Sequence, residues 1–275
     1  MKPVAFALLL LLAPGCALAD PVSLDGHLTQ GGLVIGQVQP GSHVTFEGRD
    51  VRVGEDGIFL LGFGREAPPQ MSVRIALSDG TIEQRDLAIV QREYDIQHID
   101  GLPEQMVTPD ASLLARIAAE RELILAAWAH DTPATDFLGG FVWPVIGPIS
   151  GVYGSQRILN GEPRQPHFGV DMAAAEGTPV MAPAGGVVRL AEPDLYFTGG
   201  TIIVDHGHGL SSTLMHLASV DVAVGQRVEQ GDIVGTVGAT GRATGPHLDW
   251  RMNLYDARID PQLLVPPMAD TVTTP

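Results

Sequence analysis

The first hundred residues are built from short apolar runs, several of which alternate with polar side chains. These runs lie at residues 33–38, 44–46, 51–53, 58–61, 73–77 and 81–85. Ser78-Asp79-Gly80 separates the last two runs and is typical of a hairpin turn. Several short strands at this spacing predict a small β-sandwich-like domain over residues 22–97. His27 and His43 stand alone in this region, which favours surface or structural roles for both.

The apolar spacing then changes to that of a helix. Apolar residues repeat at near-helical intervals among charged ones, at Leu113, Leu114, Ile117, Leu123 and Trp128. Thr108 is placed to cap this helix, and Pro109 suits its first position. We therefore expect a connecting helix at about residues 108–130, packed on the domain that follows, inside a helix-and-linker region of residues 98–140.

Strand-like runs and glycine turns return over residues 141–265, before a tail at 266–275. Residues 178–188 and 224–235 share a pattern rich in valine and glycine. This pattern is typical of hairpins in lipoyl- and biotinyl-type domains, which carry their cofactor on a lysine. The only lysine of the chain is Lys2, so a carrier role is excluded. We expect a mainly β chain that ends in an antiparallel, barrel-like domain.

The N-terminus has the parts of an export signal. A short positive start with Lys2, an apolar run at residues 4–13 and the small-residue site Ala17-Leu18-Ala19 form a secretory signal peptide at residues 1–19. Cleavage after Ala19 would give an exported, periplasmic protein. Lipid attachment at Cys16 is the alternative, because Gly15-Cys16 resembles the end of a lipobox.

Composition narrows the chemistry that remains. Without the signal, the chain has no lysine and no cysteine, which excludes a Schiff-base lysine, a thiol nucleophile and a thiolate-ligated metal. The full chain has 16 basic and 32 acidic residues, a net charge of −16 that argues against nucleic-acid binding. No later apolar run is long enough to span a membrane. Any catalytic site must therefore use histidines and carboxylates.

Two histidine–aspartate pairs stand at spacings that suit a shared site. His167 and Asp171 are four residues apart, and His247 and Asp249 are two apart. Residues at even spacing in a strand point to one face of the sheet. Imidazole and carboxylate ligands without a thiol suit a catalytic zinc ion, which keeps one position open for water.

Five segments together resemble the LytM or lysostaphin-type zinc metalloendopeptidases of peptidoglycan. The resemblance covers about residues 152–265 and rests on the segments 167–171, 177–188, 205–217, 224–235 and 238–250. It implies one zinc ion per chain, with His167 and Asp171 as ligands. It also implies catalytic roles for His216 and His247.

The chain departs from this family at position 249. The family's last motif is H-x-H, with the second histidine as a zinc ligand, whereas this chain has Asp249. In one interpretation Asp249 is the third ligand; two carboxylates would then cancel the metal's formal charge and make its water less acidic. In the other, the site is degenerate. We favour the first, because the other site residues are all present.

The resemblance implies hydrolysis by a metal-activated water. One of His216 and His247 would assist deprotonation of the water, and the other would stabilise the oxyanion. His206 follows a strand and is a candidate for the cleft, although a structural role is favoured. Arg251 shares the strand face of Asp249, so it could orient Asp249 or bind a substrate carboxylate.

The sequence thus predicts an exported zinc endopeptidase that cleaves peptide cross-links in the peptide stems of peptidoglycan. By analogy the bond is D-alanyl–diaminopimelate, with a glycine bridge as the alternative within the family. The N-terminal domain would position substrate or cover the cleft. The rival hypothesis is a catalytically degenerate module that binds the cell wall or activates a separate amidase or other partner protein.

Overall fold

The computed structural model describes residues 21–101 and 108–268. The predicted signal peptide at residues 1–19 and most of the predicted tail lie outside these ranges. Within them, no helix is long and apolar enough to cross a membrane. As predicted, the fold of these residues is mainly β, with antiparallel sheets and one α-helix in the described ranges.

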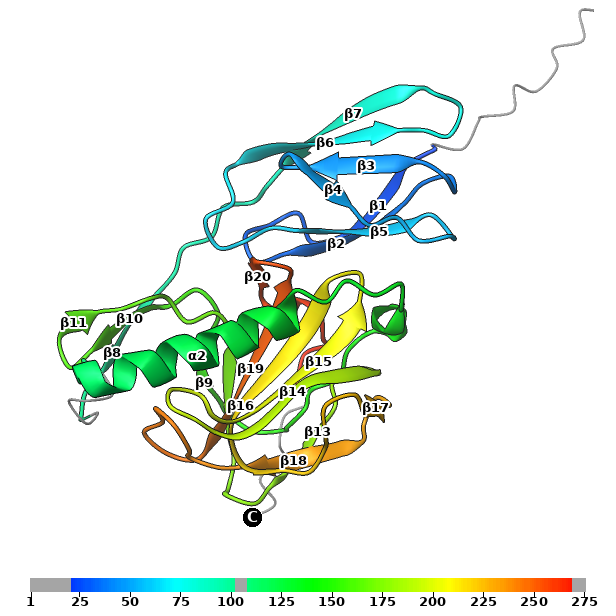
Figure 1. The fold of residues 1–275 in the computed structure, drawn as a ribbon. Coiled ribbons are helices and arrows are strands. Elements are labelled where there is room, and N and C mark those ends of the chain that lie inside the picture. Colours follow the sequence, from blue (N-terminus) through cyan, green and yellow to red (C-terminus); the bar gives the residue numbers. More distant parts are fainter. Residues whose placement is uncertain (1–20, 102–107, 269–275) are drawn as a thin grey trace, which may run out of the picture.

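The N-terminal part is a sandwich of two small sheets (Figure 1). The first sheet contains β1 (Ser23–Gly26), β2 (Leu33–Gln37) and β5 (Ile58–Gly62). The second contains β3 (His43–Phe46), β4 (Arg49–Val51), β6 (Gln70–Ala76) and β7 (Ile82–Ala88). Alternate residues of these strands, such as Val73 and Ile75 on β6, point inward and form an apolar core with Phe59. The β-sandwich-like fold predicted for this part is therefore confirmed.

One long helix, α2 (Ala111–Trp128), follows the sandwich. Its last turns bury Ala127 and half-bury Ile124 against strands β14 and β15 of the second part. The prediction of Thr108 as the N-cap is wrong, because the cap is Asp110, in an extended conformation. The Thr108 hydroxyl instead accepts a hydrogen bond from Arg164 Nη2 at 3.4 Å.

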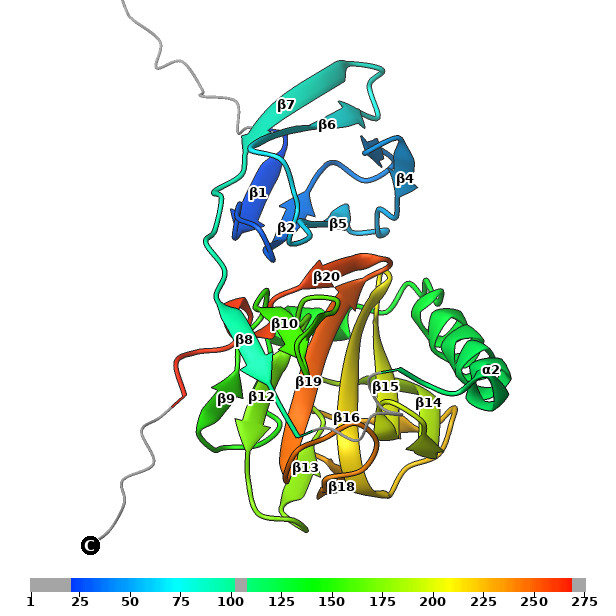
Figure 2. The ribbon, with the colours of Figure 1, turned by 90° about the vertical axis from the view of Figure 1, so that its left-hand side faces the viewer.

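The second part is one large, strongly bent sheet with a small sheet beside it (Figure 2). The large sheet has the order β17-β14-β15-β16-β19-β12-β9, with β13, β18 and β20 at its sides, and it does not close into a barrel. Its strands are β9 (Ile149–Gly151), β12 (Val170–Ala173), β13 (Pro179–Met181), β14 (Gly186–Leu195), β15 (Gly199–Gly207), β16 (Leu210–Val220), β17 (Arg227–Val228), β18 (Ile233–Val237), β19 (His247–Leu254) and β20 (Ala257–Ile259). Two short 3-10 helices, Asp136–Gly139 and Pro261–Leu263, flank it.

The small sheet connects the two parts of the molecule. It contains β8 (Ile96–Ile99), which leaves the sandwich, and β10 (Gln156–Leu159) and β11 (Glu162–Pro163) from the second part. β8 pairs with β10 in parallel. In Figure 2, this sheet lies on the opposite side of the large sheet from α2.

Strand register brings the chemically important residues into one row. Asp171 on β12 stands directly opposite Asp249 on β19, and Met215 on β16 stands opposite Asp249 from the other side. His216 is the residue after Met215 on β16, so it lies beside this row. His247 lies two residues before Asp249 on β19. The central strands thus determine the geometry of the site.

Candidate metal and catalytic site

Three side chains converge at the centre of the large sheet. One ligand atom from each of His167, Asp171 and Asp249 lies within 4.8 Å of the other two. His167 Nε2 is 2.9 Å from Asp171 Oδ1 and 3.3 Å from Asp249 Oδ2. All three residues are buried. The sequence prediction that these residues share a site agrees with this arrangement.

The donor atoms of this cluster fit a divalent metal ion. His167 Nε2 and Asp171 Oδ1 are buried and, apart from the contacts within the cluster, have no hydrogen-bond partner among the described residues. Nδ1 of His167 lies 3.3 Å from the Val152 carbonyl oxygen, which only accepts, so Nδ1 carries a proton. Burial would lower the pKa of His167, but Asp249 and Asp171 raise it, so Nε2 of the metal-free protein also holds a proton, which a bound metal ion would replace. One imidazole and two carboxylates form a donor set that zinc accepts.

Each aspartate of the cluster is paired with an arginine. Arg251 donates to both oxygens of Asp249, with Nη2 at 2.7 Å from Oδ2 and Nε at 3.1 Å from Oδ1. Arg157 Nη2 donates to Asp171 Oδ2 at 2.6 Å. A carboxylate oxygen has two lone pairs, so a hydrogen bond from arginine leaves it able to bind a metal. The two guanidinium groups balance the two carboxylate charges.

These neighbours set the ionisation of both aspartates. Burial alone would raise the pKa of Asp249, but Arg251 and His167 hold that pKa well below its usual range. Burial and Asp249 would likewise raise the pKa of Asp171, yet His167 and Arg157 hold it below its usual value. Both groups are therefore carboxylates and available as anionic ligands at neutral pH.

Two further histidines face this cluster. The rings of His216 and His247 lie 4.8 Å apart, centroid to centroid. Their Nδ1 atoms are each 2.8 Å from a carbonyl oxygen, of Thr240 and Gly245 respectively. Because a carbonyl only accepts, Nδ1 is protonated in both rings and Nε2 is left for chemistry.

His216 is held in a conformation that costs free energy. Its φ of 65° lies in the left-handed region, which a non-glycine residue adopts rarely. The backbone N–H donates to the Thr198 carbonyl oxygen at 2.8 Å, which fixes the residue from the other side. Burial lowers the pKa of His216 to about 4, so the ring is neutral at physiological pH.

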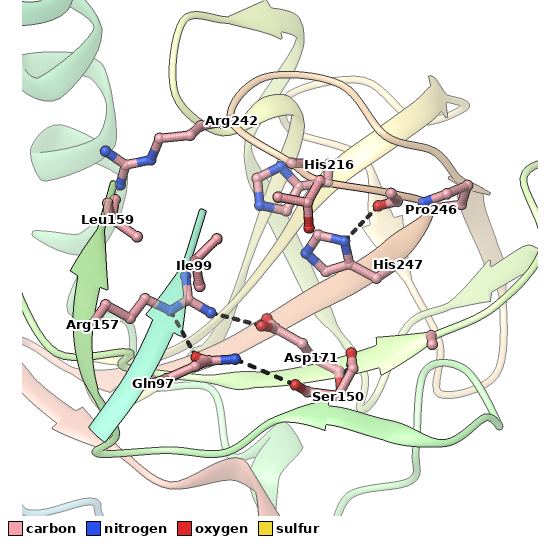
Figure 3. Close-up of a pocket in the computed structure, with 14 residues that line it drawn as sticks. Gln97, Ile99, Ser150, Arg157, Leu159, Asp171, His216, Arg242, Pro246 and His247 are labelled. Atoms are coloured by element: carbon pink, nitrogen blue, oxygen red, sulfur yellow. Dashed lines mark hydrogen bonds and ion pairs between the residues drawn. The ribbon is translucent and has the colours of Figure 1, made fainter. Parts of the chain in front are cut away.

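The cluster opens onto a groove of about 280 Å³ (Figure 3). Strands β8, β10 and β12, with the loop before β19, form its walls. It is lined by Gln97, Ile99, Ser150, Arg157, Leu159, Asp171, Ala173, His216, Arg242, Ala243, Thr244, Gly245, Pro246 and His247. Among these, Gln97 and Ile99 come from the segment that leaves the sandwich. Within the described ranges, the sandwich strands β1–β7 line no part of it.

Two residues that the sequence suggested for the site, His206 and Arg251, have structural roles instead. His206 is fully buried, with Nδ1 at 2.6 Å from the Gly185 carbonyl oxygen and Nε2 at 2.7 Å from Ser212 Oγ. It lies outside the groove, so the cleft role considered for it does not agree with its position. Of the two roles considered for Arg251, the structure favours orienting Asp249, because its guanidinium holds that carboxylate.

Sequence reasoning missed Arg157, Gln97 and Arg242. Arg157 lies on β10 in a segment without any motif, and it reaches Asp171 only because β10 crosses beside β12. Gln97 accepts from Arg157 Nε at 3.4 Å through the parallel pairing of β8 with β10. Arg242 lies in the segment 238–250, but nothing in the sequence indicates that the loop turns it toward the groove.

The second part of the chain is similar to known peptidases. The profile of peptidase family M23 matches residues 165–261. Residues of this region are 35% identical over 107 positions to the peptidoglycan DD-endopeptidase ShyC of Vibrio cholerae, covering 39% of this chain and 24% of that protein. They are 38% identical over 109 positions to the DD-carboxypeptidase/endopeptidase Mpg of Neisseria meningitidis, covering 40% and 24%.

A solved structure extends the likeness to most of the chain. A Pseudomonas aeruginosa protein assigned to the M23 peptidases is 31% identical, with a TM-score of 0.65, covering 86% of this chain and 93% of that one. The chain therefore belongs to peptidase family M23. It spans only about a fifth to a quarter of the length of the curated relatives.

Proposed function

We propose that this protein is an exported, zinc-dependent endopeptidase that hydrolyses peptide cross-links of peptidoglycan. The observation that supports this most is the convergence of His167, Asp171 and Asp249 on one point, facing His216 and His247 across an open groove. The M23 relatives named as peptidoglycan endopeptidases support the substrate class. The bond we propose is D-alanyl–diaminopimelate.

The residues of the chain divide the reaction between them. A zinc ion held by His167, Asp171 and Asp249 would supply Lewis-acid polarisation of the water and the scissile carbonyl. His216 takes a proton from the attacking water on Nε2, because burial keeps that nitrogen unprotonated. His216 then returns the proton to the leaving amine nitrogen, while the partly exposed His247 stabilises the oxyanion.

The pairing of Asp249 with Arg251 gives one reason to consider a second candidate. An arginine that engages both carboxylate oxygens also suits a degenerate site that no longer binds a metal. The protein would then act by binding the cell wall or by activating a separate amidase. In that case the groove would recognise peptide without cleaving it.

An assay on isolated sacculi distinguishes the two candidates. Zinc-loaded wild-type protein is expected to release soluble muropeptides that carry a new amine and a new carboxyl group, identified by mass spectrometry. His216→Ala is expected to reduce the rate about 10²- to 10⁴-fold while retaining the metal. No release by the wild type, together with faster release by an added amidase, would establish the rival instead.

We further propose that residues 1–19 export the protein to the periplasm, with lipid attachment at Cys16 as the alternative. We also propose domains at residues 22–97 and 141–265, joined by the region 98–140. Mass spectrometry of the protein from a periplasmic extract tests the export proposal. A mature N-terminus at Asp20 supports cleavage after Ala19, whereas a lipidated Cys16 at the N-terminus supports the alternative.

A further inference from the structure

A series of hydrogen bonds connects the segment that leaves the sandwich to the metal cluster. Arg157 Nη2 donates to Asp171 Oδ2 at 2.6 Å, and Arg157 Nε donates to Gln97 Oε1 at 3.4 Å. Both nitrogens belong to one rigid, planar guanidinium group. Figure 3 shows the three side chains connected in this order. A proposed metal ligand is thus joined to β8 through a single arginine.

Strand pairing and a second hydrogen bond determine how Gln97 meets Arg157. The two residues stand directly beside each other in the parallel pair of β8 and β10. The Gln156 N–H donates to the Asp95 carbonyl oxygen at 2.8 Å, which fixes the start of this pair. Gln97 Nε2 donates to the Ser150 carbonyl oxygen on β9 at 3.5 Å. Because the amide nitrogen is used in this way, the amide oxygen is the atom that Gln97 presents to the guanidinium.

The carboxylate of Asp171 is confined from two sides. Its Oδ2 lies against the backbone of Gly151 on the neighbouring strand β9, where any side chain would collide with it. The same oxygen accepts the hydrogen bond from Arg157. Oδ1 is therefore the oxygen that faces the cluster, at 2.9 Å from His167 Nε2. A ligand atom that is held in place beforehand loses less conformational freedom when a metal ion binds.

The hold on Asp171 depends on Gln97 as well as on Arg157. Their pair is largely withdrawn from water, since the side chains of Arg157 and Asp171 are only 17% and 8% exposed. In such surroundings, removal of an acceptor costs free energy. Without Gln97, Arg157 Nε would lose the acceptor that the structure gives it. The guanidinium would then turn toward another acceptor, and its hydrogen bond to Asp171 would weaken.

We propose that Gln97 and Arg157 are positioning residues for the metal ligand Asp171, so that binding of the metal ion and docking of β8 strengthen each other. This inference rests on the proposed function, because it concerns the zinc ion of that site. β8 continues the segment that leaves the sandwich, so the N-terminal part of the molecule influences the metal through Gln97. The free energy that β8 contributes to metal binding is returned as stability of β8 in the metal-bound protein.

Zinc affinity tests the two residues without depending on catalysis. The zinc Kd is measured by competition with a chromophoric chelator, and the visible spectrum of the cobalt-substituted protein reports ligand geometry. Gln97→Leu changes no charge and should raise the Kd about 10- to 100-fold and shift the cobalt bands. Arg157→Lys keeps the charge but lacks the fork, so it should show a similar loss. The double variant should lose little more than either single variant, because both changes break the same connection.

Hydrogen exchange measures the reciprocal effect on β8. Zinc should slow exchange of the backbone amides of residues 96–99 in the wild type, and this protection should be lost in Gln97→Leu. His98→Leu is the matched control, since His98 is the next residue on β8, is exposed and does not line the groove. This variant should keep both the zinc affinity and the zinc-dependent protection of the wild type.

Wild-type zinc affinity in a folded Gln97→Leu variant, or exchange of β8 that is independent of zinc in the wild type, would overturn the positioning role. Multiplied losses of affinity in the double variant would also overturn it, because the two residues would then act separately. Release of muropeptides from sacculi is scored separately. A wild type that binds zinc tightly but releases nothing contradicts the proposed function alone, so the two failures are distinguishable.

Discussion

At the scale of single residues, the most informative position is Asp249. Its carboxylate is fully buried, and Arg251 on the same face of β19 engages both of its oxygens. Arg251 offsets the negative charge that this aspartate brings to the site. We infer that Asp249 and Arg251 act as one unit whose charges offset each other. A water bound to the metal should therefore be more acidic than it would be beside two uncompensated carboxylates.

This inference predicts a dependence between the two positions. Asp249→His alone should lose zinc binding, because Arg251 would remain beside the metal without its carboxylate. The double variant Asp249→His with Arg251→Gln should regain it. Zinc stoichiometry and the visible absorption spectrum of the cobalt-substituted proteins measure the difference.

Arg251→Gln alone serves as the control for this pair. It leaves a buried carboxylate without its partner, so the metal-free protein should lose about 3–5 kcal/mol of stability, and zinc should restore much of that loss. Equal zinc binding by the single Asp249→His variant and the double variant would show that the two residues act independently.

At the scale of elements, β19 and the loop before it organise the site. The strand register sets Asp249 opposite Asp171, while the loop supplies the Thr240 carbonyl that fixes His216. The loop depends on Gly241, whose backbone passes close to Gly199. A side chain at position 241 would therefore displace the loop, and with it both His216, the proposed general base, and the wall of the groove.

Gly241→Ala is expected to destabilise the protein by more than about 1 kcal/mol. The displaced loop should also lower kcat/KM about tenfold or more. Gly139→Ala is the control outside the groove, because a Cβ there meets no atom within 4 Å. Thermal unfolding and sacculus hydrolysis of the two variants make the comparison, and equal behaviour would contradict the role of Gly241.

The contact between β15 and β16 through His206 predicts a pH effect on stability. Burial lowers the pKa of His206 below its ordinary value of about 6.5. The stability that the neutral ring contributes is complete above pH 6.5 and decreases as the pH falls below it. Between pH 7.5 and 5.5, the Tm of metal-free wild type should therefore fall more than that of His206→Gln. An identical fall in both proteins would exclude this linkage.

The sequence predicted the strands and the site pairs well because both depend on local spacing. Alternate residues of a strand point to one face, which predicted a shared face for His247, Asp249 and Arg251. The even spacing of His167 and Asp171 likewise predicted that these two side chains lie together. Arg157 and Gln97 could not be predicted, because they reach the site through pairing between distant strands. The helix cap was misplaced because Thr108 uses its hydroxyl for a contact with Arg164, a residue 56 positions away.

At the scale of the whole molecule, the sandwich and the large sheet are joined by apolar and ionic contacts. Leu33 and Leu60 of the sandwich belong to the same buried cluster as Leu254 and Ile259 of the second part. Arg92, in the segment after the sandwich, pairs with the buried Asp260 at 2.8 Å. This segment continues into β8, so the docking of the sandwich also determines one wall of the groove.

Arg92→Met should reduce stability by about 3–5 kcal/mol, because it leaves the Asp260 carboxylate buried without its partner. Protease cleavage between the sandwich and β8 should become faster. Arg49→Met is the matched control, since its pair with Asp256 also joins the two parts but is exposed, and it should change stability by about 1 kcal/mol or less. Denaturant unfolding measures both, and equal losses would contradict the importance of the buried pair.

A zinc titration of the metal-free protein tests the central claim most directly. Release of muropeptides from sacculi is measured as zinc is added in fractions of an equivalent per chain. The proposed site predicts that the rate rises in proportion to zinc, stops rising at one equivalent and is lost again on adding a chelator. Zinc that never binds, or a fully zinc-loaded protein that releases nothing, would contradict the claim.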